Sequence, residues 1–64
     1  MDRYHRTMVK AEEYLLGLGF TFHAKAPWGS MIYGKKETRA IFKAEIKSAP
    51  SGSMYPWMTT IVET

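Results

Sequence analysis

Cysteine is absent from this 64-residue sequence, so no disulfide can stabilise the fold. Only two histidines are present, His5 and His23, and a structural zinc site needs more nitrogen or sulfur ligands than these supply. No run approaches the roughly 20 apolar residues of a membrane span, and the charged N-terminus lacks the apolar core of a signal peptide. These absences predict a cytoplasmic protein with no cofactor, metal or membrane partner.

The length predicts a single domain over residues 1–64. A chain this short buries only about 60% of its unfolded surface, so we expect close packing, a homo-oligomer or a bound partner to add stability. Hydrophobic residues make up 45% of the chain, which is typical of a globular protein. The net charge of +3 is concentrated in residues 20–48, where an anionic partner would be met.

The clearest pattern is strict alternation along residues 39–48. Phe42, Ala44 and Ile46 fall on one side of an extended chain, and Lys43 and Glu45 fall on the other. This alternation predicts a half-buried strand, which we take as the centre of a sheet.

Residues 3–18 carry apolar side chains at helical spacing. The predicted stripe consists of Tyr4, Met8, Ala11, Leu15 and Leu18. Asp2 is positioned to cap the first turn, and Gly17 or Gly19 can take the left-handed conformation that ends a helix. We therefore expect an amphipathic helix from residue 3 to residue 18.

Two further strands are predicted between this helix and the central strand. Residues 20–26 alternate, with Phe20, Phe22, Ala24 and Ala26 expected on one face; residues 27–30 have the composition of a turn, and residues 31–35 form the next strand. The short connections favour an antiparallel meander. The predicted fold class is α+β, with the helix packed on an antiparallel sheet of three to four strands.

Residues 49–56 have the composition of a loop, and residues 57–63 are predicted to form a last strand. Both faces of that strand carry large side chains. It is either an edge strand half-covered by the helix, or a strand that pairs across a homodimer or with a partner's strand. Whether it joins the same sheet is left open by the sequence.

An apolar set indicates a protein-binding surface. Aromatic residues and methionine are enriched at protein interfaces, and the two loops that carry most of the set could meet at one end of the sheet. The alternative is that these side chains only fill the core. The predicted protein-binding residues are Trp28, Tyr33, Met54, Tyr55, Trp57 and Met58.

A basic set indicates a second kind of partner. Lysines and arginine on the outer sheet face, with aromatic rings nearby, are typical of nucleic-acid binding, because cations release counterions and rings stack on bases. The alternative is a solvated sheet face, and Glu45 lies among the lysines. The predicted nucleic-acid-binding residues are Lys25, Lys35, Lys36, Arg39, Lys43 and Lys47.

Catalysis has little support in the sequence. His5 and His23 are possible acid–base groups, but neither has an apparent second base or a metal-binding acidic pair. We predict no catalytic residue and no enzyme activity.

One local pattern resembles a known family. The segments Leu18-Gly19-Phe20 and 29–33 (Gly-Ser-Met-Ile-Tyr) resemble the helix-to-strand region of HicA-type RNA-cleaving toxins, which have a double-stranded-RNA-binding-like fold. The resemblance covers about half of the chain and implies RNA cleavage as a remote alternative. In that family the catalytic histidine follows the Gly-Ser pair, where this chain has Met31. The family's closing helix also has no counterpart in residues 54–64, so the activity does not carry over.

The sequence therefore predicts a small, basic, non-enzymatic binding protein. We expect a protein partner, in the manner of a phage-type accessory protein or inhibitor that binds a host protein. Nucleic-acid binding is the alternative.

Overall fold

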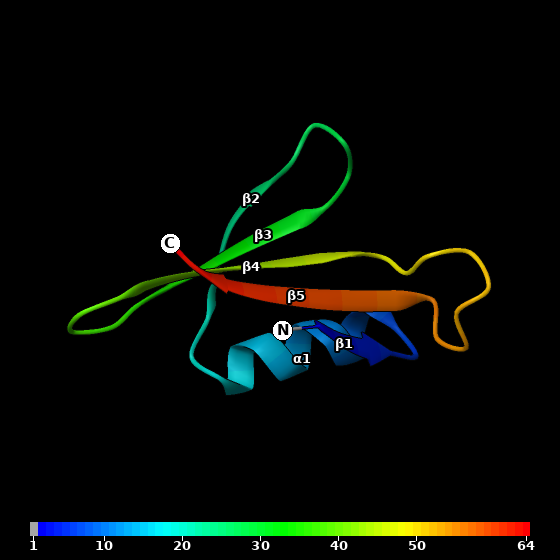
Figure 1. Ribbon diagram of the computed structural model, residues 1–64, viewed down its shortest axis with the longest axis horizontal. Coiled ribbons are helices and arrows are strands. Elements are labelled where there is room, and N and C mark those ends of the chain that lie inside the picture. Colours follow the sequence, from blue (N-terminus) through cyan, green and yellow to red (C-terminus); the bar gives the residue numbers. More distant parts are fainter. Residues whose placement is uncertain (1) are drawn as a thin grey trace.

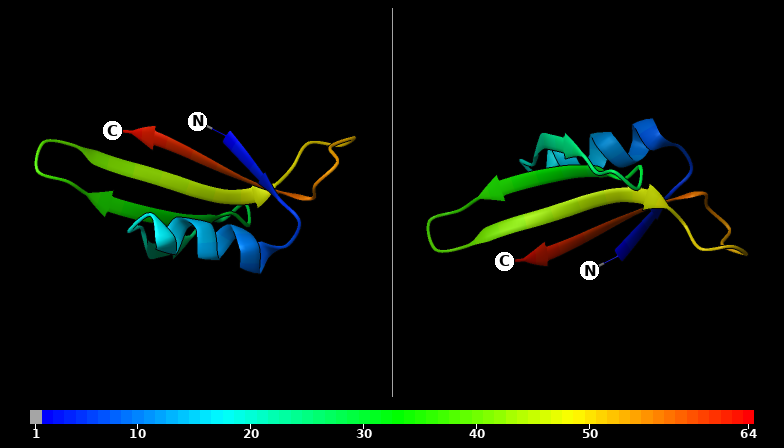
Figure 2. Two further views of the ribbon diagram at one scale, coloured as in Figure 1. Left: turned by 90° about the horizontal axis from the view of Figure 1, so that it is seen from below. Right: turned by 90° about the horizontal axis from the view of Figure 1, so that it is seen from above.

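The computed structural model describes residues 2–64, which form one helix and one five-stranded antiparallel sheet. The helix lies on one face of the sheet, and the other face carries no helix (Figures 1 and 2). The predicted α+β class is confirmed, with five strands where three to four were expected. The elements in chain order are β1 (Asp2–His5), α1 (Met8–Gly17), β2 (Thr21–Lys25), β3 (Met31–Lys36), β4 (Ile41–Ser48) and β5 (Trp57–Glu63).

The helix begins later than the sequence pattern indicated. Thr7 is its N-cap, with extended backbone angles and a hydroxyl that accepts from the Lys10 amide at 3.1 Å. The predicted start at residue 3 and the predicted cap at Asp2 are wrong, because residues 2–5 form β1 instead. At the other end Gly19 has a φ of 94°, and the Phe20 amide donates to the Leu15 carbonyl at 3.0 Å. This is a Schellman ending, which turns the chain directly into β2.

The last strand, β5, lies inside the sheet. The strand order is β1-β5-β4-β3-β2, so β5 pairs with β1 on one side and with β4 on the other. Arg3 lies opposite Thr59, and His5 lies opposite Trp57. Both interpretations from the sequence are wrong for this arrangement: β5 is not an edge strand, and it has no free edge for pairing across a homodimer or with a partner's strand.

The core lies between α1 and the helix side of the sheet. As predicted, Phe42, Ala44 and Ile46 of β4 share one face, and Ala44 and Ile46 are buried. Ala11 and Leu15 of α1 are fully buried against this face. The small side chains of Ala11 and Ala44 let the helix approach the sheet closely, which is why this short helix packs tightly.

An irregularity in β2 changes which residues share a face. Phe22 pairs with Tyr33, but Ala24 pairs with Ile32, and the register shifts between them. The prediction that Phe22 and Ala24 share a face is therefore wrong. Phe22 lies on the helix side with Tyr33, and Ala24 lies on the open side.

Candidate protein-binding surface

The turn between β2 and β3 presents Trp28 at its tip. The Gly29 amide donates to the Ala26 carbonyl at 2.9 Å, and the Ala26 amide donates to the Ser30 carbonyl at 2.7 Å. Gly29 has a φ of 99°, as the last position of a three-residue hairpin loop requires. Both closing residues are buried, whereas Trp28 is 71% exposed. The turn is thus a rigid support for an exposed indole.

The Trp28 indole is fixed in place by an acidic side chain. Its Nε1 donates to Oε2 of Glu45 on β4 at 3.0 Å. Hydrogen bonds from Trp28 and Ser30, together with the nearby Lys47 and Lys43 charges, lower the pKa of Glu45 against the opposing effect of burial. Above its pKa the ionised carboxylate is the stronger acceptor, so the indole is held most firmly at neutral pH.

The loop of residues 49–56 lies at the same end of the sheet (Figure 1). A bond of 2.8 Å from the Ala49 amide to the Pro56 carbonyl closes its base, and Gly52, with a φ of 90°, turns its outer part. Met54 in this loop is 88% exposed. Tyr55 is half-buried, and the Arg6 guanidinium lies 5.4 Å from the centre of its ring.

Both tryptophans of the chain line one groove at this end. The groove has a volume of 360 Å³ and lies between the β2–β3 turn and the start of the 49–56 loop. Its lining includes Trp28, Ser30, Lys47 and Trp57. A separate apolar hollow of 250 Å³ is lined by Tyr4, Ser53, Met54 and Tyr55. We call the surface formed by Tyr4, Trp28, Met54, Tyr55 and the exposed side of Trp57 the tryptophan end.

Part of the predicted protein-binding set is not on this surface. Tyr33 is only 2% exposed and packs in the core beneath α1, with its hydroxyl 3.4 Å from Oε2 of Glu12. Burial and the Glu12 carboxylate raise the pKa of the Tyr33 hydroxyl. Met58 is buried as well. Placing these two side chains on a surface was wrong, and Tyr4 was missed because residues 3–18 were taken as one helix.

The predicted basic residues do not form one face. Lys36, Lys43 and Lys47 lie on the open sheet face. Lys35 lies on the helix side, where its ammonium donates to the Leu18 carbonyl at 2.7 Å and pairs with Glu37 at 3.3 Å. Lys25 shares the helix side by its pairing with Met31, and Arg39 lies in the β3–β4 turn. The open face therefore carries three of the six predicted basic residues.

The two histidines lie in different surroundings, one buried and one exposed. His5 is buried in β1, where its Nε2 lies 3.0 Å from the Thr59 hydroxyl and its ring is 5.2 Å from that of Tyr14. Burial and the neighbouring Arg3 charge lower the pKa of His5. His23 is exposed at the irregularity of β2. Within residues 2–64, no group of three or more histidine, aspartate or glutamate side chains is arranged to hold a metal ion.

Comparison with known proteins gives no relative: no family model, curated protein or solved structure matches this chain. The described part of the chain has no helix long and apolar enough to cross a membrane.

Proposed function

We propose that this chain is a non-enzymatic binding protein that docks on another protein through the tryptophan end. The observation that carries the proposal is the exposure of Trp28 and Met54 on two loops at one end of the sheet. Large apolar side chains that protrude from exposed loops, next to a groove, are typical of protein interfaces.

The side chains at this end have the properties of binding hot spots. Tryptophan and tyrosine dominate the binding energy of many interfaces, because each buries a large area with few rotatable bonds. Trp28 is held by Glu45, and the ring of Tyr55 is held by Arg6, so little conformational entropy is lost on binding. Met54 is flexible and can adapt to the partner's surface.

The charges around this end favour an acidic partner. Lys47 lines the groove between the tryptophans, and Arg6 lies over Tyr55. Glu45 also lies here, but its carboxylate is engaged by Trp28. An apolar patch with aspartate or glutamate at its rim would match this arrangement.

The test compares a double variant that adds charge at the tryptophan end with a single variant that adds charge at the other end of the sheet. Trp28→Lys with Met54→Lys puts charge on the tryptophan end, and Ile41→Lys puts charge on an apolar position that is 52% exposed at the other end of the sheet. Affinity capture from lysate of the producing cells, followed by binding of the purified partner, should succeed with the wild type and with Ile41→Lys. We expect the double variant to bind at least about 100-fold more weakly, as for hot-spot residues. Equal binding by both variants would overturn the proposal.

Nucleic-acid binding remains the second candidate, and one observation favours it. Lys36, Lys43 and Lys47 share the open face with the indole of Trp28, which is bonded to Glu45 of the same face. The double change Lys43→Glu with Lys47→Glu should then abolish binding of single-stranded RNA or DNA measured by fluorescence anisotropy at low salt. Binding that is absent in the wild type, or that survives this double change, would exclude it.

The narrower predictions from the sequence remain predictions. These are an accessory or inhibitor role towards a host protein, a cytoplasmic location, and RNA cleavage as a remote alternative. For RNA cleavage, His23→Ala should remove activity while leaving the fold intact, and purified protein that leaves RNA uncut would exclude that activity.

A further inference from the structure

The helix layer of this protein covers only part of its sheet. Strands lie about 4.8 Å apart, so five strands span roughly 19 Å between the outermost axes, whereas a helix with its side chains is about 10 Å wide. α1 lies closest to β1, β4 and β5. On the same side, Phe22 of β2 is 53% exposed. Room for a second element therefore remains beside α1, above β2 and β3.

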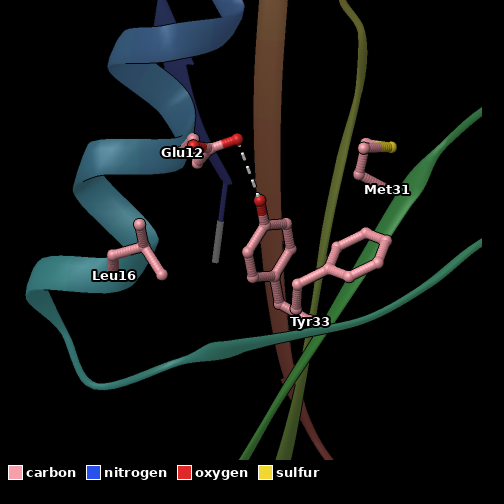
Figure 3. A pocket seen from close by; sticks show the side chains of 5 residues that line it. Glu12, Leu16, Met31 and Tyr33 are labelled. Atoms are coloured by element: carbon pink, nitrogen blue, oxygen red, sulfur yellow. Dashed lines mark hydrogen bonds between the residues drawn. The ribbon is translucent and has the colours of Figure 1, made fainter.

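An apolar groove marks this position. It has a volume of 280 Å³ and is lined by Glu12 and Leu16 of α1, Phe22 of β2, and Met31 and Tyr33 of β3. Figure 3 shows Glu12 and Leu16 on the helix, with Tyr33 and Met31 on the strand side. Leu16 is 50% exposed, and Val9, seven residues earlier on the same flank of α1, is also exposed. This flank of the helix thus carries two apolar side chains, Val9 and Leu16, that stay exposed within residues 2–64.

The edge of β2 does not favour an added strand. The register shift between Phe22 and Ala24 interrupts the ladder in the middle of this five-residue strand. Such irregularities protect sheet edges from pairing with other chains. The groove lies beside α1 in the helix layer, so a helix fits it better than a strand does.

A second copy of this chain is a poor occupant. A two-fold axis that placed one α1 beside its symmetry mate would bring Glu12 and Glu13 of the two copies together. Carboxylates brought next to each other in this way repel. Among the five lining residues Glu12 alone is charged, and its carboxylate faces the groove beside the Tyr33 hydroxyl. An occupant with complementary charge therefore carries a cation opposite the Glu12 carboxylate.

We propose that this groove binds an amphipathic helix of a partner protein, with apolar side chains against Leu16 and Phe22 and a lysine or arginine opposite Glu12. Helix-in-groove recognition places apolar anchors at i, i+3 or i+4, and i+7. The groove lies on the helix side of the sheet and shares no lining residue with the tryptophan end. It is thus a second proposed docking surface, and its test does not depend on the outcome of the test for the tryptophan end.

The test is a selection from a displayed library of helical peptides against the full wild-type protein, with counter-selection on Phe22→Lys. The expected result is enrichment of peptides that combine the apolar spacing above with a lysine or arginine. Synthetic versions of these peptides should bind Phe22→Lys and Leu16→Lys at least about tenfold more weakly than wild type. Trp28→Lys, which alters only the tryptophan end, should bind them with unchanged affinity.

Two controls separate the charge from the apolar contact. Glu12→Gln should weaken binding of a peptide with the basic residue, and it should leave unchanged the binding of a peptide in which glutamine replaces that residue. Circular dichroism and thermal unfolding establish that each variant is folded. The proposal is overturned if no helical peptide is enriched, or if enriched peptides bind Phe22→Lys as well as wild type. It is also overturned if the wild-type protein sediments as a dimer that Phe22→Lys dissociates, because the groove is then occupied by a second copy.

Discussion

The indole Nε1 of Trp28 donates to Oε2 of Glu45 across 3.0 Å, and so joins the tip of the β2–β3 turn to the middle strand of the sheet. The bond is stronger when the carboxylate is ionised. Since the pKa of Glu45 is lowered in the folded protein from the ordinary 4.5, this extra stability is present above pH 4.5 and is lost as the pH falls through the folded value.

This relationship predicts a pH-dependent change in Trp28 fluorescence. In a Trp57→Phe protein, Trp28 is the remaining tryptophan, and its emission should change as the pH falls below about 4.5. Adding Glu45→Gln, which keeps an acceptor but cannot titrate, should abolish the change. A flat profile with Glu45 present would contradict the prediction, as would an unaltered profile with glutamine in its place.

The buried His5 predicts that stability falls in mild acid. Its pKa is lowered in the folded protein, so the unfolded chain takes up a proton first as the pH drops through 6.5. Stability should be fully present above pH 6.5, should decline below it, and should level off under the folded pKa. Urea unfolding of wild type at a series of pH values measures this slope.

A matched histidine provides the control for that slope. His5→Gln should flatten the profile, because the group beside Thr59 no longer titrates. His23→Gln removes an exposed histidine and should leave the profile as in wild type. If both variants behave alike, the acid sensitivity arises elsewhere.

Two adjacent leucines of α1 predict opposite results. Leu15 is fully buried beneath the helix, whereas Leu16 faces the open groove. Leu15→Ala should lower the free energy of unfolding by about 2–5 kcal/mol, and Leu16→Ala by less than about 1 kcal/mol. Urea denaturation followed by circular dichroism measures both. Similar losses for the two variants would mean that α1 sits in a different rotation on the sheet.

The pairing of β1 with β5 predicts self-association when β1 is removed. Deletion of residues 1–6 exposes the β1-facing edge of β5, a seven-residue strand rich in threonine, isoleucine and valine. Sedimentation velocity should then show concentration-dependent dimers or larger species that the full chain does not form. A second variant, Arg3→Pro with Tyr4→Pro, breaks the same pairing at full length and should behave similarly. A folded, monomeric deletion variant would contradict the prediction.

The sequence predicted the features that repeat along the chain and missed those set by a single residue. The alternation around Ala44 located β4 and its buried face correctly, because a period of two is maintained over the whole strand. The spacing of Tyr4 and Met8 suits a helix equally well, so the start of α1 was placed too early. The better signal was Thr7, an N-cap residue directly before the first buried turn.

The candidate site was predictable in part for the same reason. Turn composition around Trp28 and in residues 49–56 correctly indicated two loops, and an antiparallel meander places them at one end of the sheet. The shift between Phe22 and Ala24 has no local sequence signal, because any residue can occupy a bulge. Because of this shift, Ala24 lies on the open face and Lys25 on the helix side, so the basic surface of the open face is smaller than the sequence predicted. The burial of Tyr33 follows from tertiary packing under α1.

The position of β5 between β1 and β4 also governs the order in which the fold can assemble. β1 is made first, yet its partner in the sheet lies 52 to 58 residues later. During synthesis, β2, β3 and β4 can pair as they emerge. β1 has no strand to pair with until β5 is made, and until then α1 has only part of the sheet to pack against. Contacts of such long sequence separation slow folding, so this small domain should fold in milliseconds to seconds rather than microseconds. Until β5 inserts, β4 presents an unpaired edge, and a nascent chain is most exposed to wrong pairing at that stage.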